Sequence, residues 1–523
     1  MLGRAAGAVL SGVEARLVDV EVHLGGGLPN IAAVGLPNSS VREGIDRIRA
    51  ALSHSGFKLP QRRVTVNLAP ADVRKDGSAL DLPIAAAILA ADGKLGEAQL
   101  PADLVLAGEL ALDGQLRPVR GVLAIAIAAR EAGRRGVVVP RANAAEARLV
   151  DGIGVWGVGG LVEALSVLLD PTAPQASPTA ATPVADGGDL ATEGDLADVR
   201  GQHAARRALE IAAAGGHHLL LSGPPGAGKT MLARRLPGIL PPMSHEEALQ
   251  VTRVFSAAGL TAGLVTRRPF RAPHHAVSLA GLTGGGLSLR PGEIALASGG
   301  VLYLDELTEF RRDALEALRQ PIESGDIVVI RLHARAVFPA RFQLVASMNP
   351  CPCGWLDDPK GRCGCTLPEI RRYRARLSGP LADRFDLGVD VPAVDPGELS
   401  GGAPPESSAA VRERVVAARE AQRARFAPGG PACNARMARA DLERFACVTG
   451  SARSLLVEAC RKLGLSARGY DRVRRVARTI ADLAGSDRML DCHVAEAVLC
   501  RSGEGLRMGR PPGDPVPAVP GPR

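Results

Sequence analysis

The stretch "HHLLLSGPPGAGKTML", His217–Leu232, decides the fold of this sequence. Its apolar start predicts a buried β-strand, and the pattern that follows predicts a helix. Between them lies a phosphate-loop pattern, in which glycines let backbone N–H groups turn towards phosphates. In this pattern Lys229 reaches the β- and γ-phosphates, and the Thr230 hydroxyl holds Mg²⁺. The sequence therefore predicts an α/β domain that binds ATP and magnesium through Gly223, Pro224, Pro225, Gly226, Ala227, Gly228, Lys229 and Thr230.

Two further apolar runs predict strands that end in polar side chains. "GGVLYLDELTEF", Gly299–Phe310, reaches Asp305 and Glu306 after four apolar residues. A buried strand brings such carboxylates to its carboxyl end, where Asp305 can order Mg²⁺ and Glu306 can polarise the attacking water. "ARFQLVASMN", Ala340–Asn349, ends in an amide that can position this water, although an Asn before Pro350 can also simply begin a turn.

Phosphoryl transfer also needs positive charge close to the transferred group. In "RLSGPLADRFDL", Arg376–Leu387, Arg384 lies just ahead of an apolar strand. An arginine at this place commonly serves the ATP of the neighbouring subunit. We therefore expect an ATP hydrolase that works only as a ring of subunits.

The composition predicts a soluble protein with two or three domains. The chain has 523 residues, more than one ordinary core accommodates, with 46% apolar residues and 3% aromatic residues. We find no apolar run of membrane-spanning length, and Glu14 and Asp19 interrupt the first apolar patch, which argues against a signal peptide. These features predict a cytoplasmic protein without membrane contact.

Positive charge is unevenly distributed along the chain. The formal net charge is +8, and arginines gather at Arg371–Arg376 and at Arg468–Arg478. Such clusters suit a polyanionic partner, although solvated helix faces explain them about as well.

A segment rich in Pro, Ala, Thr and Gly, Asp170–Gly194, has almost nothing to bury and predicts a linker. It separates an N-terminal domain from an ATP-binding region, which is followed by an arginine-rich helical region. The predicted boundaries are 1–170 for the N-terminal domain, 171–194 for the linker, 195–395 for the ATPase domain, 409–505 for the helical domain and 506–523 for a disordered tail.

Four cysteines form a compact group in "MNPCPCGWLDDPKGRCGC", Met348–Cys365. Four thiolates within fifteen residues are enough for a tetrahedral zinc site, and a reducing compartment disfavours disulfides. Reduced thiols in a tight turn are the alternative, whereas a catalytic cysteine lacks a nearby histidine partner. The predicted zinc ligands are Cys351, Cys353, Cys363 and Cys365, and the predicted core thiols are Cys433, Cys447, Cys460, Cys492 and Cys500.

These motifs occur together with "PFRAPHHAVSLAGLTGGG", "MNPCPCG" and "LSARGYDRVRRVARTIADL", and nearly the whole chain resembles the ComM (YifB) family of magnesium-chelatase-like AAA+ ATPases. The resemblance implies a hexameric ATPase with a helix-2 insert at Phe270–Gly286 and a β-hairpin around Ile327–Val337. It also implies that Arg384 is the arginine finger and that Arg468 is the second sensor arginine. The adjacent His274 and His275 are assigned to the insert rather than to a metal, because neighbours in an extended segment point to opposite faces.

The N-terminal domain, including "RVTVNLAPADVRKDGSALDLPIAAAILAA", resembles the Lon-protease-type domain of the ribosomal S5 second-domain fold. Proteolysis in that family needs a serine nucleophile and a lysine base. Alignment through "KDG" places the nucleophile at Ala79, one residue after Ser78, and alignment through "RPVRG" places the base near Ala124. The resemblance therefore implies an α+β domain without the protease dyad, acting as a scaffold or in DNA handling.

The ComM resemblance implies a homo-hexameric motor on single-stranded or branched DNA. Its expected activity is helicase or branch-migration activity during recombination of incoming DNA in natural transformation. A magnesium-chelatase-like ATPase subunit or a protein-remodelling ATPase is the alternative, because the ATPase core is shared. The N-terminal domain and the cysteine group favour the motor, and the missing dyad argues against an ATP-dependent protease.

Overall fold

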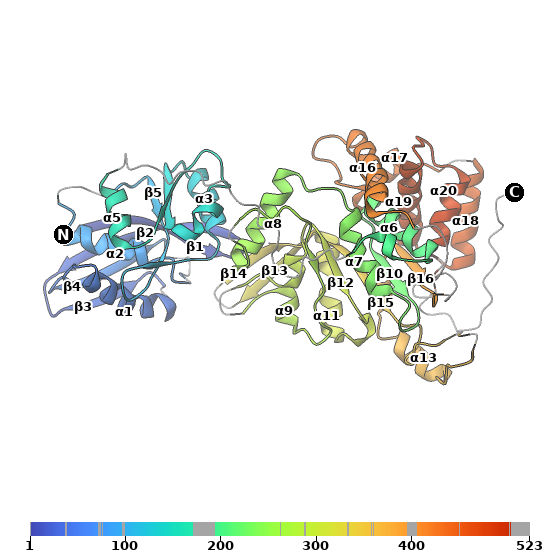
Figure 1. Cartoon of the computed structure of the whole chain (residues 1–523), viewed down its shortest axis with the longest axis horizontal. Helices are drawn as coiled ribbons and strands as arrows, with labels where there is room; N and C mark the ends of the chain where they lie inside the picture. The colour runs from blue at the N-terminus through green and yellow to red at the C-terminus, as the bar shows by residue number, and fades with distance from the viewer. Residues whose placement is uncertain are drawn as a thin grey trace.

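The computed structural model describes residues 2–36, 39–71, 75, 77–96, 100–170, 194–261, 263–286, 289–331, 334–356, 358, 360–394, 405–448, 450–501 and 503. The molecule is elongated, with the N-terminal domain at one end, the nucleotide-binding sheet in the middle and a helical domain at the other end (Figure 1). Most of the predicted linker and the whole predicted tail lie outside the described residues.

The N-terminal domain is built on a mixed seven-stranded sheet in the order β3-β4-β2-β1-β5-β8-β9. β1, β2 and β4 pair antiparallel, and the other neighbours pair parallel. The strands are β1 (Leu2–Ser11), β2 (Glu14–Gly25), β3 (Asn30–Val34), β4 (Arg63–Ala69), β5 (Leu104–Leu106), β8 (Gly136–Pro140) and β9 (Gly154–Val158), with a separate ribbon of β6 (Glu109–Leu110) and β7 (Leu116–Arg117). The helices are α1 (Ser39–His54), α2 (Asp81–Ala91), α3 (Val122–Glu131), α4 (Ala144–Ala147) and α5 (Leu161–Leu169).

Helix α2 explains how this domain is held together. Its sequence "DLPIAAAILAA" is apolar on all sides, and ten of its eleven residues are buried, as expected for a helix enclosed by its domain. The architecture is α+β, as predicted, while the specific likeness to a Lon-type domain stays a prediction.

The middle of the molecule contains the predicted parallel sheet, with five strands in the order β11-β12-β15-β10-β16. The strands are β10 (Leu219–Ser222), β11 (Phe270–Arg271), β12 (Val301–Leu304), β15 (Gln343–Met348) and β16 (Leu387–Asp390). The helices of this region are α6 (His203–Gly215), α7 (Lys229–Ile239), α8 (His245–Ala258), α9 (Leu279–Thr283), α10 (Glu293–Leu296), α11 (Arg312–Ala317), α12 (Arg319–Ser324), α13 (Leu367–Arg374) and α14 (Gly379–Ala382).

Both faces of this sheet are buried, which explains the continuous apolar runs in its strands. Successive side chains point to opposite faces, so Leu219 and Leu221 join one core while Leu220 joins the other. The first core contains α6 and α7 and also the helical domain, and the second contains α8 and α11.

The helical domain shares the first core with the sheet. Its helices are α16 (Ser408–Arg425), α17 (Arg439–Phe445), α18 (Gly450–Leu463), α19 (Ala467–Leu483) and α20 (Asp491–Leu499). The amphipathic helix α19 buries Val473, Val476 and Ile480 against this core. The fully buried His217 before β10 contacts Thr479 of α19 through its Nε2 at 2.8 Å. The sheet and the helical domain therefore pack as one unit.

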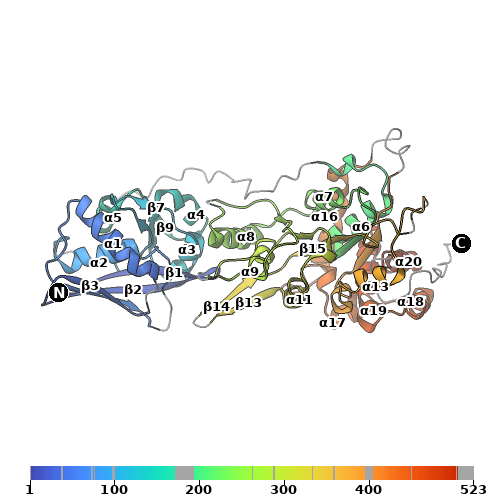
Figure 2. The same cartoon turned by 90° about the horizontal axis from the view of Figure 1, so that it is seen from below.

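The predicted β-hairpin is confirmed. Strands β13 (Asp326–Arg331) and β14 (Ala334–Pro339) pair antiparallel, and their apolar side chains alternate between faces. The expected insert at Phe270–Gly286 contains β11, at the edge of the sheet, and the five-residue helix α9. Figure 2 shows the hairpin beside the N-terminal domain.

The N-terminal domain docks on α8 of the nucleotide-binding domain. The Ser256 hydroxyl donates a hydrogen bond to the buried Glu146, and the Gly121 N–H donates to the Ser256 carbonyl at 3.1 Å. Arg253 of α8 donates from Nε to the carbonyl of Val13 at 2.9 Å. Because Glu146 and Ser256 are each 1% exposed, these contacts form a closed polar interface between the two domains.

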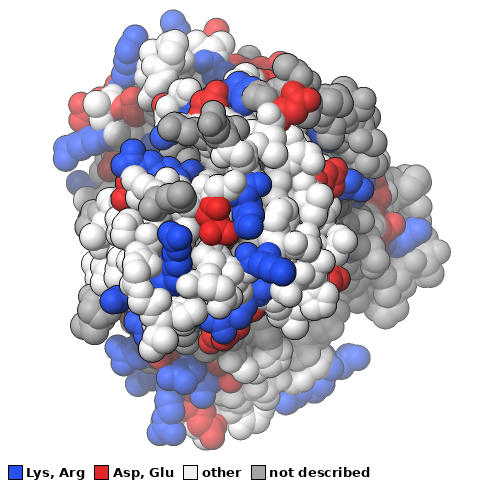
Figure 3. All heavy atoms as spheres, turned by 90° about the vertical axis from the view of Figure 1, so that its left-hand side faces the viewer, with Lys and Arg blue, Asp and Glu red and all other residues white. Residues whose placement is uncertain are grey.

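Net charge differs between the N-terminal domain and the rest of the chain. On the end formed by the N-terminal domain, acidic and basic side chains are interspersed (Figure 3). Residues 1–170 contain 18 Lys and Arg and 18 Asp and Glu, so the net charge of +8 belongs to the rest of the chain.

Among the described residues no helix is both long enough and apolar enough to cross a membrane.

Candidate nucleotide and metal sites

The phosphate-loop residues lie between the end of β10 and the start of α7. Gly226 and Gly228 adopt positive φ angles of 76° and 88°, which glycine tolerates without a side-chain clash. Lys229 is the first residue of α7, and its Nζ donates hydrogen bonds to the carbonyls of Gly223 at 2.6 Å and Pro224 at 2.9 Å. Phosphate oxygens can take the place of these two carbonyls as hydrogen-bond acceptors for Lys229.

Asn349, directly after β15, lies next to this lysine. Its Oδ1 accepts a hydrogen bond from Lys229 Nζ at 3.0 Å. Burial lowers the pKa of Lys229, and the charges of Asp305 and Glu306 oppose this effect. The parallel register pairs Ser222 with Met348, so the ends of β10 and β15 meet at the same edge.

Asp305 follows β12 at the same edge of the sheet. Its Oδ2 accepts a hydrogen bond from the Thr230 hydroxyl at 2.9 Å, which joins the two residues predicted to hold magnesium. The hydroxyl of Tyr303 lies 2.9 Å from Asp305 Oδ1 and 3.2 Å from Thr230 Oγ1. A carboxylate and a hydroxyl in contact are the hard oxygen donors that Mg²⁺ prefers, so the residues fit this ion.

Hydrogen bonds keep Asp305 charged. Burial disfavours the carboxylate, but hydrogen bonds from Ser347, Thr230 and Tyr303 outweigh burial and place the pKa of Asp305 below its ordinary value. Ser347 belongs to β15 and donates to Asp305 Oδ1. The side chain therefore remains an anionic ligand well below neutral pH.

Glu306 has a strained backbone and an accessible side chain. Its φ is 51°, in the left-handed region that costs a residue with a Cβ roughly 1 kcal/mol. Its N–H donates to Asp305 Oδ1 at 3.1 Å and to Ser347 Oγ at 3.3 Å. The side chain is 58% exposed, and its Oε2 lies 3.8 Å from Nδ1 of His275. A carboxylate held this way can accept a proton from a water molecule.

The sequence did not reveal three neighbours of this site. Tyr303 and Ser347 lie inside apolar strands, and His275 was assigned only to the insert. A pattern in the sequence could have identified the first two. Tyr303 and Ser347 each carry a hydroxyl two residues before a polar residue, Asp305 or Asn349, that was already assigned to the site. His275 carries no comparable signal, because its approach to Glu306 depends on how residues 272–278 cross the end of the sheet.

Arg384 is buried and paired, which the sequence did not predict. Its side chain is 5% exposed and forms an ion pair with Glu323, next to the hairpin. The acids beside it in sequence have other partners, since Arg472 pairs with Asp386 at 2.8 Å and Arg501 pairs with Asp383 at 3.6 Å. Arg384 Nε and Nη1 are buried without a hydrogen-bond partner among the described residues.

Arg384 lines a cavity of about 320 Å³ between the sheet and the helical domain. Arg468, in the first turn of α19, is exposed and lines the same cavity, so the two arginines predicted to act on ATP are brought together. Burial lowers the pKa of Arg384, Glu323 opposes this effect, and Arg468 and Arg472 add to it. The other arginines of the cavity are Arg436, Arg472 and Arg475.

This cavity lies at the opposite end of the sheet from the phosphate loop. Ser222 pairs with Asp390 in the parallel β10–β16 ladder, so Arg384 precedes the beginning of β16 while Gly223 follows the end of β10. The four paired residues of β10 and β16 lie between the two levels, a rise of roughly 13 Å along the strands. Arg384 therefore lies at the end of the sheet away from the phosphate loop of its own subunit, and Arg468 lines the same cavity as Arg384.

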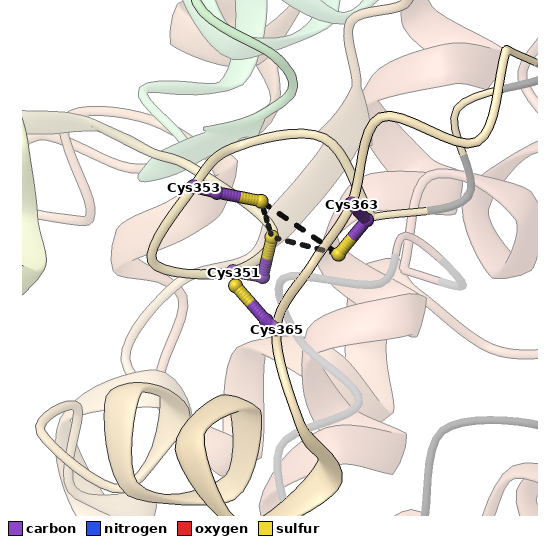
Figure 4. Close-up of side chains that lie close together, drawn as sticks. All are labelled: Cys351, Cys353, Cys363 and Cys365. Carbon is purple, nitrogen blue, oxygen red and sulfur yellow. Dashed lines mark hydrogen bonds between the residues drawn. The ribbon is translucent and has the colours of Figure 1, made fainter.

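The four cysteines of the predicted zinc site converge after β15 (Figure 4). Their sulfur atoms all lie within 4.8 Å of one another. The Sγ–Sγ distances are 3.4 Å for Cys351–Cys353, 3.8 Å for Cys351–Cys363 and 3.7 Å for Cys353–Cys363. A disulfide requires about 2.05 Å. Ligands about 2.3 Å from a tetrahedral zinc lie about 3.8 Å from each other, so this donor set fits zinc.

Burial raises the pKa of Cys351 to about 12, whereas a hydrogen bond from the Trp355 backbone lowers the pKa of Cys353 to about 6. Cys353 is therefore the first thiol of this group to become a thiolate, the form that binds metal.

Of the cysteines predicted to be core thiols, Cys433 is buried, but Cys447 and Cys492 are exposed. The prediction is wrong for these two because they lie near helix ends, where helical periodicity says little about burial.

The sheet order, the phosphate loop after β10 and the packed helical domain define a P-loop nucleotide-binding protein of the AAA+ class. Three family matches agree with this class. The family described as "Magnesium chelatase, subunit ChlI" matches residues 195–399, "Subunit ChlI of Mg-chelatase" matches residues 20–143, and "Magnesium chelatase, subunit ChlI C-terminal" matches residues 405–501.

Full-length relatives define the family more closely. The chain is 45% identical to the uncharacterized protein YifB of Salmonella typhimurium over 501 residues, 94% of this chain and 95% of YifB. It is also 45% identical to the competence protein ComM of Haemophilus influenzae over 495 residues, 93% of this chain and 95% of ComM. A shorter match, 36% identity over 118 residues, covers 22% of this chain and 24% of the DNA repair protein RadA of Escherichia coli. The chain belongs to the ComM/YifB family of magnesium-chelatase-like AAA+ ATPases.

Proposed function

We propose that the protein is a ring-forming ATP hydrolase, a homo-hexamer, in which each ATP site is completed by the neighbouring subunit. The observation that carries this proposal is the position of Arg384 and Arg468, which share one cavity at the end of the sheet remote from the phosphate loop. The Nε and Nη1 atoms of Arg384, which have no partner among the described residues, and the exposed Arg468 suit a ligand that another subunit brings.

In this proposal the residues at the phosphate-loop end perform the chemistry. Lys229 exchanges its carbonyl partners for phosphate oxygens, and Asn349 and Glu306 orient the attacking water, with Glu306 accepting its proton. Thr230 and Asp305 hold magnesium, which supplies positive charge to the phosphates when bound. Arg384 of the next subunit stabilises the charge that develops on the transferred phosphoryl group.

We further propose that the ring acts on DNA, as a helicase or branch-migration motor in recombination of incoming DNA in the cytoplasm. Two observations support this substrate: a relative 45% identical over nearly the whole chain is named a competence protein, and the net positive charge resides outside residues 1–170. Polyanion binding needs such charge. The N-terminal domain acts as a scaffold or in DNA handling, since the buried Ala124 offers no amine where a protease base would be.

The DNA proposal predicts that polynucleotide accelerates ATP hydrolysis. Steady-state ATPase rates are measured without DNA and with single-stranded, duplex and branched DNA of equal nucleotide concentration. We expect single-stranded or branched DNA to raise the rate several-fold, and added salt to reduce this effect by competing for phosphate contacts. A rate that does not respond to any of these DNAs would contradict the proposal.

An ATPase indifferent to DNA would favour a second candidate, a chelatase-like or protein-remodelling subunit. The family matches support this candidate, because all three are described as magnesium chelatase subunits. One of them covers residues 20–143, so the N-terminal domain no longer distinguishes the two candidates.

The cysteine cluster predicts a bound zinc ion. Purified protein should contain about one zinc per chain by elemental analysis, and replacing Cys351 and Cys353 together by Ser should release it, because two thiolate ligands are lost. Cys447→Ser is the matched control, since Cys447 is an exposed cysteine outside the cluster and its replacement should leave the zinc content unchanged. Fully active protein without metal would reject the proposal.

A further inference from the structure

The loop that carries the cysteine cluster packs directly against the phosphate loop. Gly354 is buried and has a φ of 81°. A Cβ atom at this position would lie 2.5 Å from Cδ and 2.8 Å from Cγ of Pro225, and 3.7 Å from Cγ of Asn349. Distances below 3 Å are not tolerated between carbon atoms, so no side chain fits between the two loops at their present separation.

The position of Gly354 depends on the cluster. Its N–H donates to the carbonyl of Cys351 at 3.0 Å, which closes a tight turn around the first two thiols. Cys351 is fully buried, and the backbone of Trp355 is hydrogen-bonded to the Cys353 sulfur. Moving either sulfur would therefore move the backbone that contacts Pro225.

The same segment contacts the phosphate loop at two other places. The Gly223 N–H donates to the carbonyl of Met348 at 3.2 Å, and Lys229 Nζ donates to Asn349 at 3.0 Å. Residues 348–354 thus touch the beginning, the middle and the lysine of the loop. Arg374 of α13 fixes the centre of the segment by donating from Nε to the Pro350 carbonyl at 3.2 Å.

We propose that Gly354 is a positioning residue for nucleotide binding, through which the metal-closed cysteine loop holds the phosphate loop in the shape that accepts ATP. This inference rests on the proposed ATP and zinc sites and adds a coupling between them. Without the wall provided by Gly354, Pro225 and the N–H groups that follow it are free to shift away from the phosphates. Position 354 requires glycine because the backbone there packs directly against the ring of Pro225 and leaves no room for a Cβ atom.

The test compares two alanine substitutions in the same loop. Gly361 also has a positive φ, 64°, but a Cβ there would have no atom of the described residues within 4 Å. Gly354→Ala and Gly361→Ala therefore carry similar backbone strain, and they differ in the contact with Pro225. We expect Gly354→Ala to weaken the affinity for a fluorescent ATP analogue by roughly tenfold, with Gly361→Ala close to the unsubstituted protein.

A compensating substitution identifies the contact. Pro225→Ala removes the Cγ and Cδ atoms that the new Cβ would meet, so Gly354→Ala should reduce the affinity much less in the Pro225→Ala protein than in the unsubstituted protein. Equal losses in the two glycine variants, or an equal cost of Gly354→Ala with and without Pro225→Ala, would overturn the inference.

Zinc analysis of every variant separates this inference from the metal proposal. If the protein holds no zinc and Gly354→Ala still costs less affinity in the Pro225→Ala protein, the contact between Gly354 and Pro225 is supported and the zinc proposal is rejected. If Gly354→Ala does not fold, chelation provides the second measurement. Removing zinc should weaken nucleotide affinity in the unsubstituted protein and less so in Pro225→Ala, and unchanged affinity on chelation would reject the coupling.

Discussion

Replacement of Glu306 by Gln is expected to remove most ATP hydrolysis while ATP and magnesium binding remain nearly normal. The amide has the shape of the carboxylate but cannot accept a proton from water, and general bases contribute about 10²- to 10⁴-fold to such reactions. The side chain is 58% exposed and is not among the groups that hydrogen-bond Asp305, so the magnesium ligands stay in place.

Turnover and nucleotide affinity must be measured separately on the same preparation. Glu309→Gln is the matched control, because Glu309 lies three residues further on and pairs with Arg376 at the surface, where ion pairs contribute little. We expect kcat to fall only in Glu306→Gln. Near-normal turnover in that variant would exclude Glu306 as the base and direct attention to another acceptor at this edge.

Most of this end of the site could be predicted because its residues lie at the ends of recognisable strands. Asp305 and Asn349 directly follow strands, Lys229 follows the loop after a third strand, and parallel strands bring their carboxyl ends to one edge. The cysteine group could also be predicted, since its ligands lie within one short loop. In each case the chemistry is encoded locally.

Contacts that depend on the register between distant strands could not be predicted in this way. Ser347 reaches Asp305 only because β12 and β15 are neighbours with Leu304 opposite Ala346. The ion pair of Arg384 with Glu323 and the interface between Glu146 and Ser256 join segments far apart in sequence, and neither has a local pattern. Sequence reasoning can identify groups at strand ends, whereas their partners require the packing.

Replacement of Arg384 by Ala should leave nucleotide affinity nearly intact and remove most hydrolysis. If Arg384 serves the neighbouring subunit, the charge on the transferred phosphoryl group is then unopposed, and such arginines contribute about 10³-fold or more. Lys229→Ala should weaken nucleotide binding itself, because it removes the amine at the phosphate loop. Arg461→Ala, a change at an exposed arginine of α18, is the control for loss of positive charge.

Mixing the two inactive variants tests whether the site is shared. Subunits with Arg384→Ala keep a sound phosphate loop, and subunits with Lys229→Ala keep a sound arginine. Rings assembled from both place an intact loop opposite an intact arginine at some interfaces, so part of the ATPase activity should return. Subunit exchange is verified by tagging one variant and recovering the other with it, and mixed rings that remain inactive would reject the shared site.

The pair with Glu323 supplies the competing explanation and its test. If Arg384 only neutralises Glu323 and secures the end of α12, then Glu323→Gln should reduce hydrolysis as much as Arg384→Ala does. If Arg384 instead completes the ATP site of the neighbouring subunit, Glu323→Gln and Arg384→Ala should differ in ATPase rate. Glu323 is 57% exposed, so Gln fits in its place, but Arg384 is 5% exposed and loses its carboxylate partner, so thermal unfolding must confirm that the variant is folded. The substitution weakens the hold on a guanidinium group whose Nε and Nη1 have no partner among the described residues. We therefore expect Glu323→Gln to keep or raise the ATPase rate, because Arg384 no longer has to leave an ion pair before it reaches the phosphates of the next subunit.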